Sequence, residues 1–106
     1  MIKYIKDDTF EQEVINKKGV YLIDFYANWC GPCMKLSHIL DEIGNSKVVY
    51  NILKIDIDEN PRVASELRID TIPALCIYKD GILVDKEIGF KEKDEIIKLL
   101  DKFKEE

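Results

Sequence analysis

The sequence has no long hydrophobic run and no segment typical of a secretion signal. The apolar run that starts at Val20 is already broken by Asp24, whereas a membrane-spanning helix needs about 18 consecutive apolar residues. The chain starts Met-Ile-Lys-Tyr-Ile-Lys, without the apolar region or small-residue cleavage site of a signal peptide. We therefore expect a cytoplasmic protein with no membrane contact.

Cysteine and basic residues are also scarce. The three cysteines are too few and of the wrong parity for a disulfide scaffold, which favours a reducing compartment. Sixteen Lys and Arg against 21 Asp and Glu give a net charge of −5, which argues against binding to nucleic acid or to anionic membranes. The chain has no repeats and no linker of Ser, Pro and Gly, so its 106 residues predict a single domain over 1–106.

What the sequence does contain is an alternation of strand and helix patterns. Dense apolar or β-branched runs predict strands, and apolar residues at helical spacing predict helices between them. A Thr-x-x-Gln capping box at Thr9 begins the first helix, and Asn60-Pro61 begins a later one. Asp80-Gly81 is typical of a hairpin turn. The predicted strands are 2–5, 20–27, 48–57, 74–78 and 82–88. The fold class is therefore α/β, with a central mixed sheet of about five strands flanked by four helices.

Cys30 and Cys33 lie three residues apart, where the strand over 20–27 passes into a helix. Unpaired N–H groups and the helix dipole at a helix N-terminus stabilise an anion, so they lower the pKa of a thiol there. Cys33 lies one turn further on, within reach of a disulfide. Pro32 falls where a missing N–H costs nothing, and it stiffens the loop. This context favours redox chemistry over purely structural cysteines.

Half of a zinc site is the competing interpretation of the Cys-x-x-Cys spacing. Zinc needs two more ligands, and the candidates are Cys76 and His38. His38 falls on the polar side of its helix and Cys76 in a predicted core strand, so we expect no metal. Cys76 is expected to be a small buried apolar residue, the alternative being an exposed thiol that forms a regulatory or dimeric disulfide.

Asp24 stands inside the apolar strand that leads to the cysteines. A charged, unpaired acid in such a place costs several kcal/mol, so it needs a partner, a proton or a role in the chemistry. Desolvation predicts a raised pKa for this carboxyl. Lys54 lies in a second core strand, where its stem could also pack while its ammonium reaches water.

The ten residues from Asp24 to Cys33 resemble the active-site segment of the thioredoxin family. The resemblance continues at residues 53–58, 72–73, 79–81 and 88–89, and it covers nearly the whole chain. Its most specific part is Trp-Cys-Gly-Pro-Cys. Several positions depart from the family pattern, among them Met34, His38, Arg68 and Ala74, and Arg68 stands where glycine is frequent.

The resemblance implies a protein-disulfide reductase that needs no cofactor of its own and is recycled by a thioredoxin reductase. It implies that Cys30 attacks client disulfides, that Cys33 resolves the mixed disulfide, and that Asp24 lies beneath the pair with Lys54 near it. It also implies that Pro73 is a cis-proline facing the disulfide. Gly31 and Pro32 support the pair, and the residues that dock clients are Trp29, Ile72, Pro73 and Gly89. We expect a monomer whose partners are the reductase and disulfide-containing proteins.

Two other functions compete with this one. A redox-inactive binding subunit is disfavoured by the intact cysteine pair, and a specialised oxidant or isomerase is disfavoured by Gly31-Pro32 and by the absence of a signal peptide. Trp29 could be an ordinary core residue, but its place directly before Cys30 favours a partly exposed side chain at the site.

Overall fold

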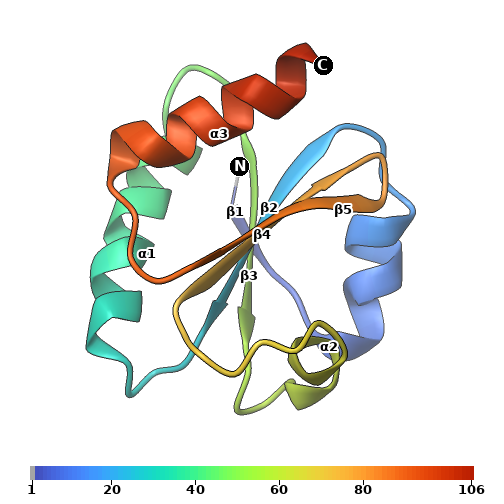
Figure 1. The fold of residues 1–106 in the computed structure, drawn as a ribbon, viewed down its shortest axis with the longest axis vertical. Coiled ribbons are helices and arrows are strands. Elements are labelled where there is room, and N and C mark those ends of the chain that lie inside the picture. Colours follow the sequence, from blue (N-terminus) through green and yellow to red (C-terminus); the bar gives the residue numbers. More distant parts are fainter. Residues whose placement is uncertain (1) are drawn as a thin grey trace.

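The computed structural model describes residues 2–106, in which five strands alternate with helices (Figure 1). The alternating sequence patterns thus predicted the element types well. In chain order the elements are β1 (Ile2–Tyr4), the 3₁₀ turn η1 (Asp7–Thr9), the π-helix η2 (Glu11–Ile15), β2 (Val20–Tyr26), α1 (Gly31–Gly44), β3 (Asn51–Asp56), α2 (Pro61–Glu66), β4 (Ala74–Lys79), β5 (Ile82–Ile88) and α3 (Lys93–Glu105).

The five strands form one mixed sheet in the order β1-β3-β2-β4-β5. β3 runs parallel to both β1 and β2, whereas β4 is antiparallel to β2 and β5. The parallel pairs arise from the strand–helix–strand units and the antiparallel pair β4–β5 from the tight turn at Asp80-Gly81. The fold class predicted from the sequence is confirmed.

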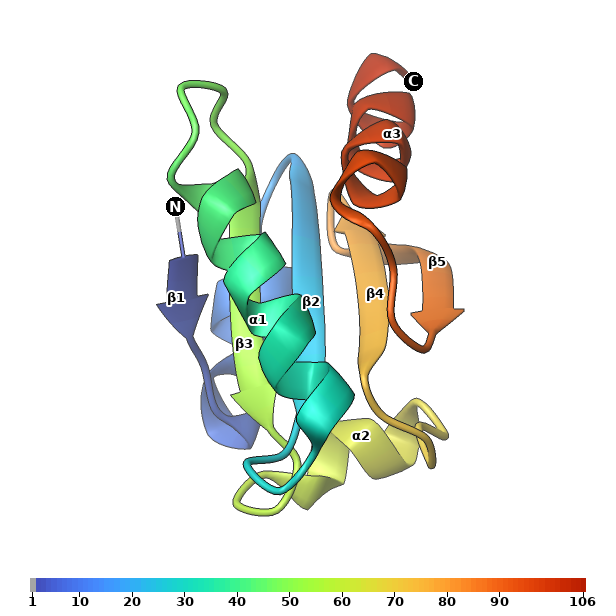
Figure 2. The ribbon, with the colours of Figure 1, turned by 90° about the vertical axis from the view of Figure 1, so that its left-hand side faces the viewer.

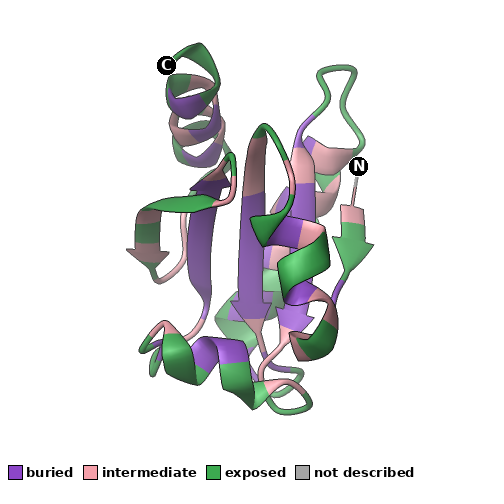
Figure 3. Ribbon diagram, turned by 90° about the vertical axis from the view of Figure 1, so that its right-hand side faces the viewer, coloured by how far each residue is buried: buried purple, intermediate pink, exposed green. Residues whose placement is uncertain are grey.

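The helices cover both faces of the sheet. α1 and α3 lie on one face, and η2 and α2 lie on the other (Figures 1 and 2). The apolar side chains of each face pack into a separate core, so the inner strands are buried while β1 and β5 at the edges are more exposed (Figure 3). β2 lies in the middle of this arrangement and leads directly to Cys30.

The first helix differs from its prediction. Thr9 was predicted to be the N-cap of a helix, but it ends the turn η1, where its Oγ1 accepts a hydrogen bond from the Lys6 N–H at 3.0 Å. The helix that follows, η2, has the wider π form. Phe10 and Val14, the apolar residues that suggested it, are buried as expected.

The N-terminus of α2 is capped from a distant part of the chain. Asn60 occupies the N-cap position predicted from the sequence, but its side chain accepts a hydrogen bond from the Asp7 N–H instead of from the helix. The carboxylate of Asp7 accepts the N–H groups of Arg62 and Val63 at 2.9 and 3.0 Å. A carboxylate at this end also complements the helix dipole. η1 and α2 are thereby tied together.

At Arg68 the backbone lies in the left-handed region, with φ 57°, which explains why glycine is frequent at this position of the family pattern. Residues other than glycine pay about 1–2 kcal/mol in that conformation. We expect Arg68→Gly to raise the free energy of unfolding by about 1 kcal/mol, after the greater flexibility of glycine in the unfolded chain is counted. Thermal unfolding of Arg68→Gly and Arg68→Ala checks this, because alanine loses the same side chain but keeps the strain. Equal midpoints for the two variants would contradict the prediction.

Candidate functional site

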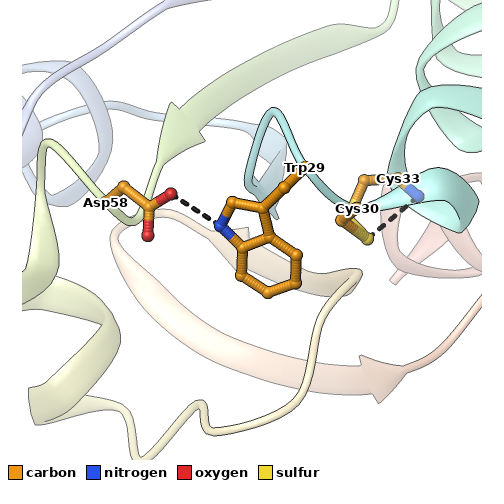
Figure 4. Close-up of a disulfide and its surroundings, with 4 residues drawn as sticks. All are labelled: Trp29, Cys30, Cys33 and Asp58. Carbon is orange, nitrogen blue, oxygen red and sulfur yellow. Dashed lines mark hydrogen bonds between the residues drawn. A yellow bond between two sulfur atoms is a disulfide. The ribbon is translucent and has the colours of Figure 1, made fainter.

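The site centres on a disulfide between Cys30 and Cys33 at the N-terminus of α1 (Figure 4). Their Cα atoms are 5.2 Å apart, and both residues are buried. Cys30 is the N-cap of α1, and its Sγ accepts the backbone N–H of Cys33 at 3.2 Å. In the reduced protein, a thiolate at this place is stabilised by the N–H groups of the first turn and by the helix dipole.

The two residues between the cysteines suit a helix start. Pro32 lies in the first turn of α1, where no backbone partner is lost. A Cβ added at Gly31 would meet nothing within 4 Å. The packing of this chain alone therefore does not require glycine at this position.

Trp29 lies on the surface beside the disulfide, with 71% of its area exposed. The interpretation of this residue as an ordinary core residue is therefore wrong. Its indole Nε1 donates a hydrogen bond to Asp58 Oδ2 at 2.8 Å (Figure 4). Asp58 follows β3 and Trp29 follows β2, and parallel neighbours end at the same edge of a sheet. Asp58 was quoted in the family resemblance, but no role was predicted for it.

The three other residues expected to dock clients come together beside the disulfide. Ile72 packs against the small cluster formed by Ala27 and the two cysteines. The Ile72-Pro73 peptide bond is cis, as the resemblance implied. The Gly89 N–H donates to the Pro73 carbonyl at 2.8 Å, which joins the segment before β4 to the end of β5.

Asp24 is completely buried in β2, with 0% of its area exposed. Neither of its carboxylate oxygens has a hydrogen-bond partner among residues 2–106. Burial raises the pKa of Asp24 to about 7, while the positive charge of Lys54 acts in the opposite direction and Asp41 adds to the rise. The predicted upward direction is confirmed, and this carboxyl can exchange a proton near neutral pH.

Lys54 is equally buried, at 1% exposure, and stands directly opposite Asp24 in the register of β2 and β3. Its ammonium does not bind Asp24 and does not reach bulk water. It donates instead to Ser37 Oγ at 2.7 Å and to Asp41 Oδ1 at 2.8 Å, both on α1. Ser37 and Asp41 were missed in the sequence, although they follow Cys33 at intervals of four and so share one side of its helix.

A hollow of about 210 Å³ opens beside Cys33. This space has room for several water molecules. Its lining is partly polar, which suits water between the buried sulfur and the surface. The lining residues are Tyr4, Tyr26, Ala27, Asn28, Cys33, Met34, Ser37 and His38.

Cys76 takes no part in the site. It is fully buried in β4, within the core on the face opposite α1, and burial raises the pKa of its thiol to about 12. The prediction of a small buried apolar residue is confirmed, and the alternative of an exposed regulatory thiol is wrong. His38 is exposed on α1. Within residues 2–106, no three His, Cys, Asp or Glu side chains are grouped so that they could hold a metal ion.

Comparisons with known proteins agree with this geometry. The family model described as Thioredoxin matches residues 1–102. The chain is 40% identical over 99 residues to thioredoxin of Staphylococcus haemolyticus, covering 92% of this chain and 93% of that one. It is 37% identical over 102 residues to thioredoxin of Chlamydia muridarum, covering 96% and 98%. A solved structure of a mutant thioredoxin from Halobacterium salinarum superposes with a TM-score of 0.88 at 30% identity, covering 97% of this chain and 90% of the other.

Proposed function

This chain belongs to the thioredoxin family, and from that premise we propose how its residues divide the chemistry of disulfide reduction. The protein is a thiol–disulfide oxidoreductase that reduces protein disulfides. The observation that carries the assignment of roles is the position of Cys30, which caps α1 while Cys33 lies one turn inside the helix.

In the proposed reaction, the Cys30 thiolate attacks one sulfur of a client disulfide. The client S–S bond breaks, a Cys30–client bond forms, and the second client sulfur leaves as a thiolate that takes a proton. Cys33 then loses its proton and attacks Cys30 Sγ, which breaks the Cys30–client bond and releases the first client sulfur as a thiolate that takes a proton. Two electrons pass to the client, and the Cys30–Cys33 disulfide is what remains.

Asp24 is proposed to accept the proton of Cys33 during resolution. A base is most effective when its pKa lies near the working pH, and burial raises the pKa of Asp24 to about 7. The hollow beside Cys33 supports the presence of water next to that residue, and a water between Cys33 and the buried Asp24 is proposed to carry the proton.

Clients are proposed to dock on the face formed by Trp29, Ile72, Pro73 and Gly89, where Trp29 is exposed, Ile72 and Gly89 are half-buried and Pro73 is buried. The packing of Ile72 on the cysteine cluster supports this, because an extended client chain paired with the Ile72 backbone would lie beside Cys30. Main-chain pairing depends little on the client sequence, which suits a general reductase. The exposed indole of Trp29 adds apolar contact area.

We further propose that residues 1–106 form one thioredoxin domain, which acts in the cytoplasm as a monomer and is recycled by a thioredoxin reductase. The unpaired, buried Cys76 supports a reducing compartment. A single chain supplies both cysteines and every proposed docking residue, which supports a monomer. No helix among residues 2–106 has the length and apolar character needed to cross a membrane. The electrons come from the reductase, so this chain is proposed to hold no cofactor or metal.

Insulin reduction coupled to NADPH and a bacterial thioredoxin reductase tests the proposal. We expect the wild-type protein to accelerate the precipitation of insulin. With Cys30→Ser, the rate of precipitation should equal the uncatalysed rate. Cys76→Ser is the matched control, because it removes a cysteine away from the site, and it should keep the wild-type rate. Activity in Cys30→Ser would overturn the role of Cys30, whereas inactivity of the wild type would argue that this reductase is not its partner.

A further inference from the structure

The buried ammonium of Lys54 is held by α1, although an unpartnered carboxylate stands opposite it in the sheet. Lys54 and Asp24 are Cα partners in the parallel register of β2 and β3, so their side chains leave the sheet on the same face. The hydrogen bonds of Lys54 nevertheless run to Ser37 Oγ at 2.7 Å and to Asp41 Oδ1 at 2.8 Å. Asp24 is left without any hydrogen-bond partner among the residues that the structure describes.

The spacing on α1 connects this arrangement to the reacting sulfur. Cys33, Ser37 and Asp41 are four residues apart and therefore form one line along the helix. Cys33 lies at the buried end of this line, and the side chain of Asp41 at the far end is 48% exposed. The ammonium of Lys54 bridges the last two positions, so its place depends on α1.

We propose that Asp41 and Ser37 are positioning residues that set the proton affinity of Asp24, because they hold the ammonium of Lys54 on α1 and away from that carboxylate. The proposal rests on the proposed role of Asp24 as proton acceptor. An ammonium free to approach Asp24 would favour its charged form and make it a weaker base. Asp41 also raises the proton affinity of Asp24 directly, because its negative charge disfavours a second negative charge nearby.

Among the charged side chains around Asp24, Lys54 and Asp41 are the ones that act on its pKa: Lys54 lowers it and Asp41 raises it. β4 places the apolar Leu75 opposite Asp24. The cysteines of α1 carry no charge while they form the disulfide. The other polar groups on this side include Tyr26 of β2 and its Cα partner Asp56 of β3, whose Oδ1 accepts the N–H of Asp58. Tyr4 of β1, whose ring centroid is 5.7 Å from Lys54 Nζ, and the exposed His38 of α1 also lie there.

The test is an NMR titration of the Asp24 side-chain carboxyl in the oxidised protein, in which Cys30 and Cys33 cannot titrate. Asp41→Asn removes the charge but keeps an oxygen that can hold Lys54, and Asp41→Ala removes both. We expect the titration midpoint to fall by roughly half a pH unit in the first variant and by about one in the second. Glu42→Ala is the control, because it removes an exposed carboxylate from the same helix that pairs with Lys93 instead. It should leave the midpoint unchanged.

Equal titration midpoints of Asp24 in Asp41→Asn and Asp41→Ala would overturn the positioning role. The same midpoint in the wild type, both Asp41 variants and Glu42→Ala would also overturn it. Ser37→Ala gives a second route to the answer if Asp41→Ala unfolds, and it should also lower the midpoint. The pH dependence of the resolving rate separates this inference from the proposed function. If the Asp24 midpoint moves in the variants while the rate profile does not, the positioning of Lys54 stands and the role of Asp24 as proton acceptor fails.

Discussion

Replacing Cys33 by serine is expected to turn the protein from a reductase into a trap for its clients. Cys30 keeps its place at the N-terminus of α1, so it still attacks a client disulfide. The mixed disulfide then persists because no neighbouring thiol resolves it. An intramolecular thiol acts at an effective concentration far above that of thiols in solution, so we expect turnover to fall by roughly a hundredfold or more. Mass spectrometry of the covalent complexes measures the outcome directly.

Matched variants give this prediction its controls. Cys30→Ser should form no complexes, and Cys76→Ser should turn over normally because the Cys76 thiol is buried away from the site. Brief alkylation of the reduced wild-type protein at pH 7 should modify Cys30 before Cys33. Faster modification of Cys33 would reverse the assignment of the two thiols. The trapped proteins would also identify the clients.

Replacing Asp24 by asparagine is expected to stabilise the protein at neutral pH while slowing its chemistry. The pKa of this carboxyl is raised from 3.8 to about 7 by burial. The unfolded chain therefore releases the proton of Asp24 more readily than the folded protein does, and the free energy of unfolding falls as the pH rises from about 4 to about 7. Asp24→Asn lacks this loss. We expect it to be more stable than the wild type by about 2 kcal/mol at pH 8, after a cost for the buried amide, and to have no such advantage at pH 4.

Two measurements together decide the matter, namely thermal unfolding from pH 4 to pH 8 and the rate at which Cys33 resolves a mixed disulfide. The rate should fall by about tenfold or more in Asp24→Asn, since proton transfer to a positioned base is lost. Asp70→Asn removes the same formal charge from an exposed position and should change neither quantity. If Asp24→Asn unfolds at a lower temperature than the wild type while the resolving rate is unchanged, Asp24 is a structural residue without a role in proton transfer.

The sequence by itself determined the features that depend on neighbouring residues. The apolar periodicity of 31–44 predicts α1, and the spacing of Cys30 and Cys33 at its start predicts their redox role. The position of Asp24 in an apolar strand predicts its burial and the direction of its pKa change. These predictions follow from local spacing or from the cost of moving a charge out of water, and none of them needs the rest of the fold.

Only the tertiary structure decided which side chains meet. Lys54 was expected near Asp24, but its ammonium binds Ser37 and Asp41, and α2 is capped by Asp7 from 55 residues away. The donor and acceptor of a hydrogen bond lie about 3 Å apart. Which side chains form one therefore depends on strand register and on the exact position of a helix on the sheet. A single sequence carries no signal for such contacts, since residues far apart in the chain are placed together only by packing of the whole domain.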